Sequence, residues 1–146
     1  MKSWCGALTA DVRVYTDGAA RGNPGPSASG FLVEIEGGDS FEHEEYNGKA
    51  TNNFAEYRAI ILALTWCGKN LKGPDRLGLE LYSDSELVVK QINGLYKVRD
   101  RKLRPMNAEV QRLALQFHMA VFKNVRRTNP KIASVDRRLN TLLDGI

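Results

Sequence analysis

The sequence predicts an α/β domain in which helices pack on one mixed β-sheet. Residues 11–17, 30–36 and 40–49 have strand-like composition and precede the first helical pattern. After that helix, strand-like and helical segments alternate along the rest of the chain. Strands first and alternation afterwards together indicate a mixed sheet covered by helices.

Turn and capping residues separate the predicted elements. The glycine-rich segment 18–29 leads into the second strand, and the turn 37–39 forms a hairpin with the third. The first helix begins where Asn53 and Glu56 fit a capping box, and it runs to about Cys67. The remaining expected elements are a strand at 77–83, a short helix at 84–92, a basic connector at 96–104, a helix at 105–121, a strand at 122–127 and a helix at 134–144.

Composition bounds the kind of protein. A chain of 146 residues with 42% hydrophobic and 26% charged residues is typical of one globular domain. We expect residues 1–10 to form an N-terminal extension and residues 11–146 the domain. The chain has no apolar run of the ~18 residues that span a membrane, so we expect no membrane partner. Cys5 and Cys67 form no metal or disulfide pattern, which is typical of a reduced, cytoplasmic protein.

Charge is distributed unevenly along the chain. The net charge is +4, but residues 32–48 contain six acidic residues and no lysine or arginine. Residues 95–138 contain twelve lysines and arginines against three acidic residues, a local net charge of +9. A cationic half of this size indicates a polyanionic partner, with a merely solvated charged surface as the alternative.

Two predicted strands end in the same way. Asp17 closes the first strand and Asp84 closes the fourth, and each follows a tyrosine, Tyr15 or Tyr82, by two residues. Alternation along a strand places each tyrosine on the same face as its aspartate. If the two strands are neighbours, their ends present two carboxylates side by side, an arrangement that holds cations.

A third carboxylate points toward the same sheet. Glu56 shares a helical stripe with Ile60, Leu64 and Cys67, so it faces the sheet rather than water. A buried carboxylate needs a cation or hydrogen bonds, and a set of carboxylate oxygens suits Mg²⁺ better than zinc. A pair of such ions about 3.5–4 Å apart can support phosphodiester hydrolysis.

Each acidic residue also has a local explanation. Asp17-Gly18 fits a turn, Glu56 fits the capping box, and Asp84 lies within the capping-box pattern from Ser83 to Glu86. Asp136 fits the first turn of the last helix, with Ser134 as its N-cap. Other chemistries have less support, because the glycine segment matches neither dinucleotide-binding nor P-loop spacing and no nucleophile motif accompanies His43 or His118.

Three motifs stand in order along the chain: Tyr15-Thr-Asp-Gly-Ala with Arg21-Gly-Asn-Pro-Gly25, Thr51-Asn-Asn-x-Ala-Glu-Tyr57, and Ser83-Asp-Ser-x-Leu-Val-Val with Gln91-x-Asn-Gly. Together they resemble type 1 ribonuclease H. The chain passes directly from Tyr96-Lys-Val to Arg-Asp-Arg-Lys-Leu-Arg104, which resembles the protrusion-less form of that family. The resemblance spans about residues 11–144. It implies a ribonuclease H-like five-stranded mixed sheet with helices on both faces, a catalytic domain over residues 11–146, and a monomer. It also implies endonucleolytic cleavage of the RNA strand of RNA/DNA hybrids with two Mg²⁺ ions, or Mn²⁺, when substrate is bound.

The same resemblance assigns catalytic and metal-binding roles. Asp17, Glu56 and Asp84 match the family's first three carboxylates. The spacing Val135-Asp136-x3-Asn140-x3-Asp144 resembles the family's terminal helix and assigns Asp136 as the fourth, although ungapped counting places Ser134 in that position. Many members have a histidine just before this helix. Residues 124–135 contain none, so either Arg126 or Arg127 substitutes or the step is absent.

Substrate contacts are also implied by the resemblance. Asn52 and Asn53 match residues that contact the minor groove of the hybrid, and Asn23 is a candidate for reading 2′-hydroxyl groups. Thr51 with Asn107 resembles a pocket for a DNA-strand phosphate, with Lys49 near it. Helix capping alone is the alternative for Asn52 and Asn53.

Two other functions fit parts of the pattern. The first is another nuclease on the same fold, because a fold does not determine a function. The second is a catalytically weak or inactive module that binds RNA/DNA hybrids.

Overall fold

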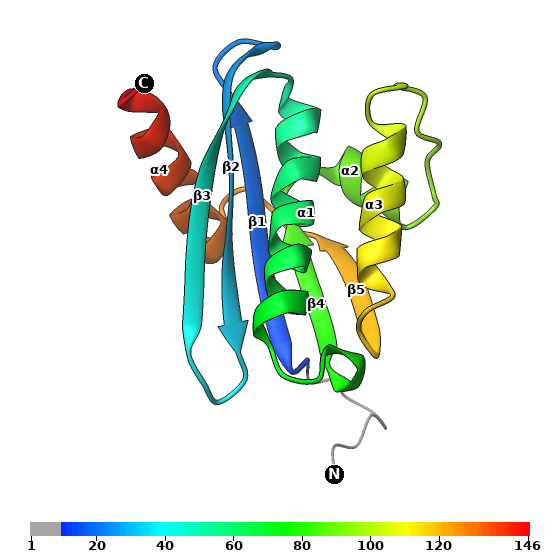
Figure 1. Cartoon of the computed structure of the whole chain (residues 1–146). Helices are drawn as coiled ribbons and strands as arrows, with labels where there is room; N and C mark the ends of the chain where they lie inside the picture. Colours follow the sequence, from blue (N-terminus) through cyan, green and yellow to red (C-terminus); the bar gives the residue numbers. More distant parts are fainter. Residues whose placement is uncertain (1–9) are drawn as a thin grey trace.

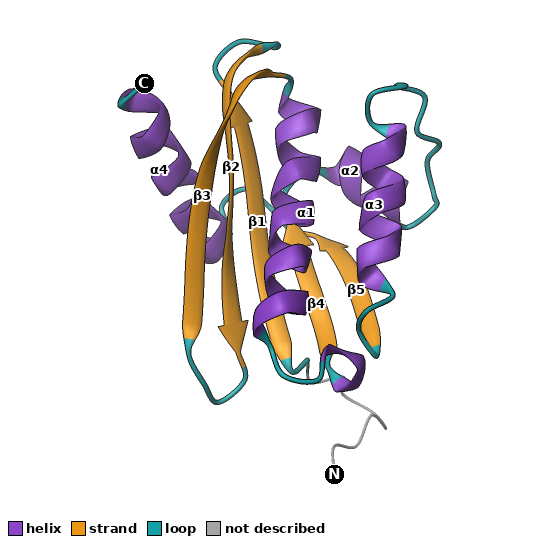
Figure 2. Ribbon diagram, viewed as in Figure 1, coloured by secondary structure: helices purple, strands orange, loops and turns teal. Residues whose placement is uncertain are grey.

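The computed structural model describes residues 10–146 and contains one five-stranded sheet with helices on both faces (Figures 1 and 2). The strand order is β3-β2-β1-β4-β5; β1 and β2, and β2 and β3, pair antiparallel, whereas β1 and β4, and β4 and β5, pair parallel. The predicted mixed sheet is therefore confirmed. The elements are β1 (Val12–Ala20), β2 (Gly25–Ile35), β3 (Ser40–Ala50), α1 (Asn52–Asn70), β4 (Gly78–Ser83), α2 (Glu86–Ile92), α3 (Arg104–Ala114), β5 (Met119–Asn124) and α4 (Pro130–Asp144), with a short 3₁₀ turn at Pro74–Arg76.

The central strand β1 carries the alternation that the sequence predicts. Val12, Val14 and Thr16 are buried on the α1 side, and Tyr15 lies on the opposite face. The Tyr15 ring stacks on Tyr82 of β4, with centroids 5.1 Å apart and an interplanar angle of 17°. The two strands pair as far as Thr16 and Ser83, and Asp17 and Asp84 come next in the chain. Asp17 therefore lies within β1 and does not close it as predicted.

Hydrophobic packing on both faces of the sheet holds the helices. Figure 1 shows α1, α2 and α3 on one face and α4 on the other. The larger core lies under α1 and α3 and includes Phe31, Tyr57, Ile60, Leu64, Leu81 and Val110. The smaller core lies under α4 and contains Ala28, Leu32, Val135, Leu139 and Leu143. A residue on α4 can therefore reach the sheet end from the face opposite α1.

The glycine-rich connection is shorter than predicted. β1 continues to Ala20 and β2 already begins at Gly25, because Gly18, Ala19 and Ala20 pair with Ser29, Ala28 and Ser27. Only residues 21–24 remain as a loop, which we call the glycine loop. Small side chains in both strands left the sequence without the apolar alternation that marks a strand.

Both predicted capping boxes are wrong. Thr51 is the N-cap of α1 and accepts a hydrogen bond from the Phe54 amide, so Asn53 does not cap the helix with Glu56. Ser85, not Ser83, caps α2 by accepting a hydrogen bond from the Val88 amide. The capping-box patterns correctly predicted that helices begin here. Tertiary contacts decide which polar side chain accepts the hydrogen bond at each helix N-terminus. α1 also runs through Gly68 to Asn70, beyond the predicted end.

The last three elements start earlier than predicted. α3 ends at Ala114 and β5 spans Met119–Asn124, where it pairs with all of β4. Apolar residues at 119–122 fit a helical stripe and a strand equally well, which explains the error. α4 begins at Pro130 with Asn129 as its N-cap, so Ser134 is not the cap and Asp136 lies beyond the first turn.

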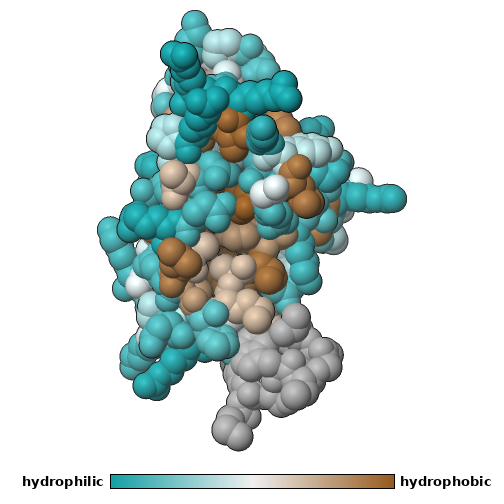
Figure 3. Space-filling model, turned by 90° about the vertical axis from the view of Figure 1, so that its right-hand side faces the viewer, coloured by the Kyte–Doolittle hydropathy of each residue, from teal (hydrophilic) through white to brown (hydrophobic). Residues whose placement is uncertain are grey.

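The surface of the described residues was compared with the hydropathy and charge of the sequence. Within residues 10–146, no helix combines the length and apolarity needed to cross a membrane. On the α3 and β5 side, hydrophilic residues dominate the upper half of the surface, and hydrophobic ones gather lower down (Figure 3). Residues 1–9, including Cys5 and nearly all of the predicted extension, lie outside the described residues.

We predict that the α4 core contributes strongly to stability. Leu139 is completely buried and Leu115 is 84% exposed. Leu139→Ala should lower the free energy of unfolding by about 3 kcal/mol, because it removes buried methyl groups and leaves a cavity. Leu115→Ala should change it by less than about 0.5 kcal/mol. Urea denaturation of both variants tests the difference, and equal effects would contradict the assigned packing.

Candidate active site

Three carboxylates converge at one end of the sheet. Asp17 comes from β1, Glu56 from the second turn of α1, and Asp84 from the residue after β4. One oxygen of each lies within 4.8 Å of the others. Asp17 is 4% and Glu56 6% exposed, so two of the three carboxylates are withdrawn from water. The expected juxtaposition of the two strand-end aspartates is confirmed, and Glu56 does point to the sheet.

Close contact between α1 and β1 holds Glu56 in place. Its Oε1 accepts a hydrogen bond from the Gly18 amide, and its Oε2 accepts one from Ser83 Oγ at 3.3 Å. A Cβ atom at Gly18 would lie 2.3 Å from the backbone carbon of Ala55, so only glycine permits this approach. The glycine after Asp17 therefore serves the packing of α1 rather than a turn.

The electrostatics of this cluster are unfavourable without a cation. Burial raises the pKa of Asp17 most, and the charges of Glu56 and Asp84 and a hydrogen bond with Asp136 raise it further. Burial also raises the pKa of Glu56, followed by the charge of Asp84, against the opposing hydrogen bond from Gly18. An ion bound among these oxygens would stabilise their ionised forms. Oxygen ligands without sulfur or imidazole suit a hard divalent cation.

Asp136 reaches the same site from the other face of the sheet. It lines a cavity of about 270 Å³ together with Asp17, Glu56 and Asp84, whereas Ser134 does not line it. Its Oδ2 accepts a hydrogen bond from Asn140 Nδ2 at 3.2 Å. The helical spacing that favoured Asp136 thus agrees with where α4 places its side chain, and the metal-binding role stays a prediction.

A single arginine enters the cavity from the loop before α4. Arg127 Nε lies 3.7 Å from Asp84 Oδ2, and its side chain is 88% exposed. Arg127 lines the carboxylate cavity, while Arg126 does not. Arg127 therefore occupies the better position of the two arginines that could replace the missing histidine. Because it is so exposed, its ion pair balances little of the buried negative charge.

The asparagines of the first helix connect it to the glycine loop. The side-chain Oδ1 of Asn52 accepts a hydrogen bond from the Ala20 backbone amide at 3.0 Å. The backbone amide of Asn52 donates to Asn23 Oδ1 at 3.1 Å. Asn53 lines both the carboxylate cavity and a neighbouring depression formed by residues of α2 and the connector after it. Asn52 and Asn53 therefore lie beside the carboxylates, and Asn23 is joined to them through the start of α1.

Thr51 and Asn107 take part in structural contacts. Thr51 caps α1, as described above. Asn107 Nδ2 donates to the Tyr57 hydroxyl at 3.1 Å, and that hydroxyl donates to Gln91 Oε1 at 2.8 Å, which ties α3 to α1 and α2. Lys49 lies near the end of β3, opposite Pro26. A phosphate pocket at Thr51 and Asn107 stays a prediction.

Sequence reasoning missed two polar residues next to this site. Arg21 and Asn140 both lie within the quoted motifs, but no role was assigned to either side chain. The structure brings them together: Arg21 Nη2 donates to Asn140 Oδ1 at 3.4 Å. A separation of 119 residues gives no periodic signal, so only the fold reveals this contact.

A five-stranded mixed sheet with carboxylates within β1, directly after β4, on α1 and on α4 defines a ribonuclease H-like α/β protein. The comparisons agree: a family model described as RNase H matches residues 9–132. The chain belongs to the ribonuclease H family.

Known relatives show how far the similarity extends. Ribonuclease HI of Halobacterium salinarum is 39% identical over 134 residues, which cover 91% of this chain and 64% of the relative. Bifunctional protein Rv2228c of Mycobacterium tuberculosis is 35% identical over 92% of this chain and 36% of its own length. The chain thus spans less than two thirds of these relatives.

Solved structures match over more of their length. The crystal structure of RNase H1 from Halobacterium salinarum superposes with a TM-score of 0.83 at 36% identity, covering 92% of this chain and 98% of that one. LC11-RNase H1 in complex with an RNA/DNA hybrid has a TM-score of 0.83 at 34% identity, covering 92% of this chain and 97% of that one. The fold assignment therefore rests on sequence and structure alike.

We predict that metal-free protein loses stability as pH rises. The pKa values of Asp17 and Glu56 are raised in the folded state, so above the ordinary value of about 4 the folded chain holds protons that the unfolded chain has released. The free energy of unfolding should fall by about 1.4 kcal/mol per pH unit between pH 5 and 7 in EDTA for each proton that the folded chain retains. Thermal denaturation at a series of pH values in EDTA measures this dependence of stability on pH. Asp17→Asn should flatten the slope, and excess Mg²⁺ should reverse it; a flat wild-type profile in EDTA would contradict the prediction.

We also predict that Gly18→Ala disrupts the site through α1. The new methyl group would collide with the backbone of Ala55 and Glu56 and push the first turns of α1 away from β1. The free energy of unfolding should fall by about 1–3 kcal/mol, and Mg²⁺ should raise the melting temperature less. Gly145→Ala, whose added Cβ would meet only ordinary contacts, is the matched control. Wild-type behaviour of Gly18→Ala would argue against this close packing.

Proposed function

We propose that this protein is a divalent-metal-dependent endoribonuclease that hydrolyses the RNA strand of RNA/DNA hybrids. The observation that carries the proposal is the cluster of Asp17, Glu56 and Asp84, whose oxygens lie within 4.8 Å of one another at the sheet end. Membership of the ribonuclease H family and the similarity to LC11-RNase H1, solved with an RNA/DNA hybrid, support the substrate class.

The residues present fit Mg²⁺ or Mn²⁺. Asp17, Glu56 and Asp84 would hold the ions together with Asp136, since all four line one cavity and offer only oxygen ligands. Bound as a pair, the ions would supply Lewis acidity for a two-metal hydrolysis of a phosphodiester. The chain's own contribution is to bury and orient the carboxylates: the Gly18 amide and Ser83 hydroxyl hold Glu56, and Asn140 holds Asp136.

Neighbouring surfaces suit a nucleic acid that carries 2′-hydroxyl groups. Asn52 and Asn53 line the cavity and Asn23 is hydrogen-bonded to Asn52, and side-chain amides can hydrogen-bond both 2′-hydroxyls and base edges. The connector between α2 and α3 is basic and exposed, with Lys97, Arg99, Arg101, Lys102 and Arg104 on the surface. These cations would bind the phosphate backbone in a salt-dependent way.

Three further expectations accompany this proposal. Residues 11–146 form the catalytic domain. The protein acts as a monomer, and it resides in the cytoplasm.

We predict that the protein cuts the RNA of a labelled RNA/DNA hybrid in Mg²⁺ or Mn²⁺ but not in EDTA. Single-stranded RNA, duplex RNA and duplex DNA should stay intact under the same conditions. Asp17→Asn should lower the rate at least about 100-fold, because losing a metal ligand costs more than the 10–100-fold typical of a residue that supports one. Asp75→Asn, at an exposed site in the 3₁₀ turn, should leave the rate unchanged.

The same panel separates the alternatives. Loss of cleavage in Asp136→Asn would support the fourth carboxylate, and a wild-type rate in that variant would remove Asp136 from the site. Cleavage of duplex DNA or of a branched DNA junction would favour another nuclease on this fold. Tight binding of the hybrid by folded wild-type protein without cleavage in either metal would overturn the proposed enzyme and leave a hybrid-binding module.

A further inference from the structure

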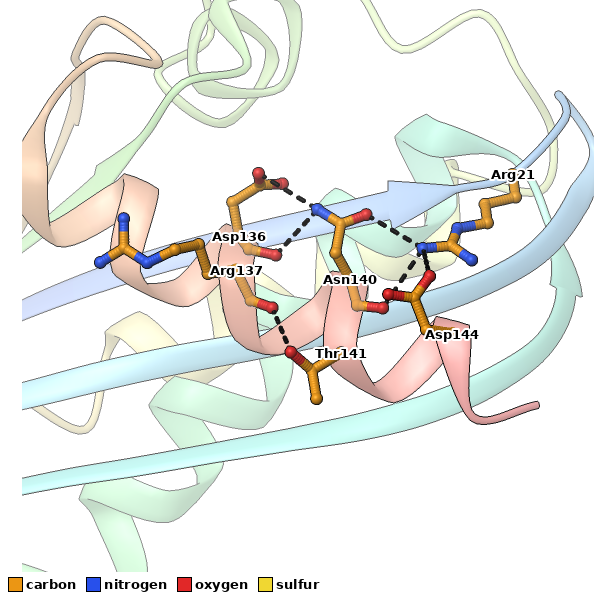
Figure 4. A network of polar contacts seen from close by, with 6 residues as sticks. All are labelled: Arg21, Asp136, Arg137, Asn140, Thr141 and Asp144. Atoms are coloured by element: carbon orange, nitrogen blue, oxygen red, sulfur yellow. Dashed lines mark hydrogen bonds and ion pairs between the residues drawn. The ribbon is translucent and has the colours of Figure 1, made fainter.

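A polar network links the glycine loop to the fourth carboxylate, and we call its four residues, Arg21, Asp136, Asn140 and Asp144, the Arg21 network (Figure 4). Arg21 Nη2 donates to the Asn140 carbonyl oxygen at 3.2 Å, to Asn140 Oδ1 at 3.4 Å and to Asp144 Oδ1 at 2.6 Å. Asn140 Nδ2 donates in turn to the Asp136 carbonyl oxygen at 3.0 Å and to Asp136 Oδ2 at 3.2 Å. The chain of contacts runs from the loop to a residue of the carboxylate cavity.

The chemistry of the arginine sets the orientation of the asparagine. A guanidinium group has donors only, so the Asn140 oxygen must face Arg21. The NH₂ group of the same amide then faces Asp136, where it donates to one carboxylate oxygen. Without Arg21 the amide could rotate and present its oxygen to Asp136, which repels a carboxylate. Arg21, together with the two acceptor oxygens of Asp136, thus fixes which atom of Asn140 meets Asp136.

The network adds little to the attachment of α4. The side chains of Arg21 and Asp144 are 43% and 70% exposed, and exposed ion pairs contribute little to stability. A different arginine, Arg138, is only 23% exposed and pairs with both Glu42 and Glu44 of β3. Leu139 and Leu143 bury the helix against the sheet. An orienting role therefore explains the Arg21 network better than a clamping role.

The glycine loop has a second attachment on the opposite face of the sheet. Asn23 Oδ1 accepts the hydrogen bond of the Asn52 amide at the start of α1, the helix that carries Glu56. Across the base of the loop, the Arg21 backbone amide donates to the carbonyl oxygen of Pro26 in β2 at 2.8 Å, which keeps the loop tight. The same four-residue loop therefore contacts both helices that bring carboxylates to the sheet end.

We propose that Arg21 and Asn140 are positioning residues that aim Asp136 at the metal-binding carboxylates. Arg21 helps to orient the Asn140 amide, and this amide holds Oδ2 of Asp136 and so directs the carboxylate into the cavity that Asp17, Glu56 and Asp84 also line. The position of the fourth carboxylate thereby depends on the glycine loop. This inference rests on the proposed function, because it assigns Asp136 to the metal site.

Metal binding without turnover is the first test. Titration of Mn²⁺ into the protein by calorimetry should give dissociation constants three- to tenfold higher for Arg21→Ala and Asn140→Ala than for wild type. Asp136→Asn should weaken binding at least as much, since it removes the carboxylate itself. Asn140→Asp should be worse than Asn140→Ala, because it places a second negative charge beside Asp136. Unchanged Mn²⁺ affinity in Asp136→Asn, or in both alanine variants, would overturn the inference.

Arg138→Ala is the matched control. It removes an arginine of α4, the helix that Arg21 contacts, and the ion pairs that are lost join α4 to β3 rather than to Asp136. It should lower the melting temperature more than Arg21→Ala and leave Mn²⁺ affinity within twofold of wild type. An equal effect of the two substitutions on metal affinity would show that both act only through the docking of α4.

Kinetics on the hybrid then separates positioning from substrate contact. Arg21→Ala should raise the Mg²⁺ concentration at half-maximal rate three- to tenfold and leave KM for the hybrid unchanged, and Arg21→Lys should recover part of the loss. A raised KM with unchanged metal dependence would mean that Arg21 binds nucleic acid instead. If wild-type protein does not cut the hybrid, the proposed function fails, while the Mn²⁺ titrations still decide the positioning role.

Discussion

The convergence of three carboxylates on one sheet, two of them buried, is the constraint on which the rest of this structure depends. Asp17, Glu56 and Asp84 repel one another, and burial denies Asp17 and Glu56 the water that would screen them. Such a cluster persists only if the surrounding packing outweighs its cost. The two hydrophobic cores provide that packing, one beneath α1 and one beneath α4. The carboxylate cluster therefore lowers the stability of the fold, and a bound divalent cation would neutralise its negative charge.

Each carboxylate is placed by a different kind of structure. The parallel pairing of β1 and β4 places Asp17 beside Asp84, and the stack of Tyr15 on Tyr82 lies below them on the same strands. Glu56 depends on the close approach that Gly18 allows, and it is held by two hydrogen bonds from the sheet. Asp136 depends on α4, which crosses the opposite face. The site therefore joins both layers of helices through the sheet, and the glycine loop contacts each of them.

Outside the cavity, some basic residues are paired with acidic residues of the fold and others are exposed. The acidic strand β3 is paired with α4 through Arg138, so part of the basic C-terminal half is used within the fold. The cations of the connector after α2 are exposed, as is Arg127 at the mouth of the cavity. The connector cations Lys97 and Arg99 line a depression that shares Asn53 with the carboxylate cavity, so under the proposed function they would attract a polyanionic substrate toward the site.

By itself the sequence determined the fold class, the mixed sheet and three converging carboxylates, because period-two alternation and helical stripes are local properties that record which face is buried. It also placed Asp136 on the last helix by spacing. Only the tertiary structure decided the caps of α1 and α2, the limits of β5 and α4, and the contact of Arg21 with Asn140 across 119 residues. Several neighbouring residues could serve as a cap or as the end of an element, and the tertiary packing around them decides which one does. Contacts between distant segments leave no periodic trace in the chain, so folding alone brings them together.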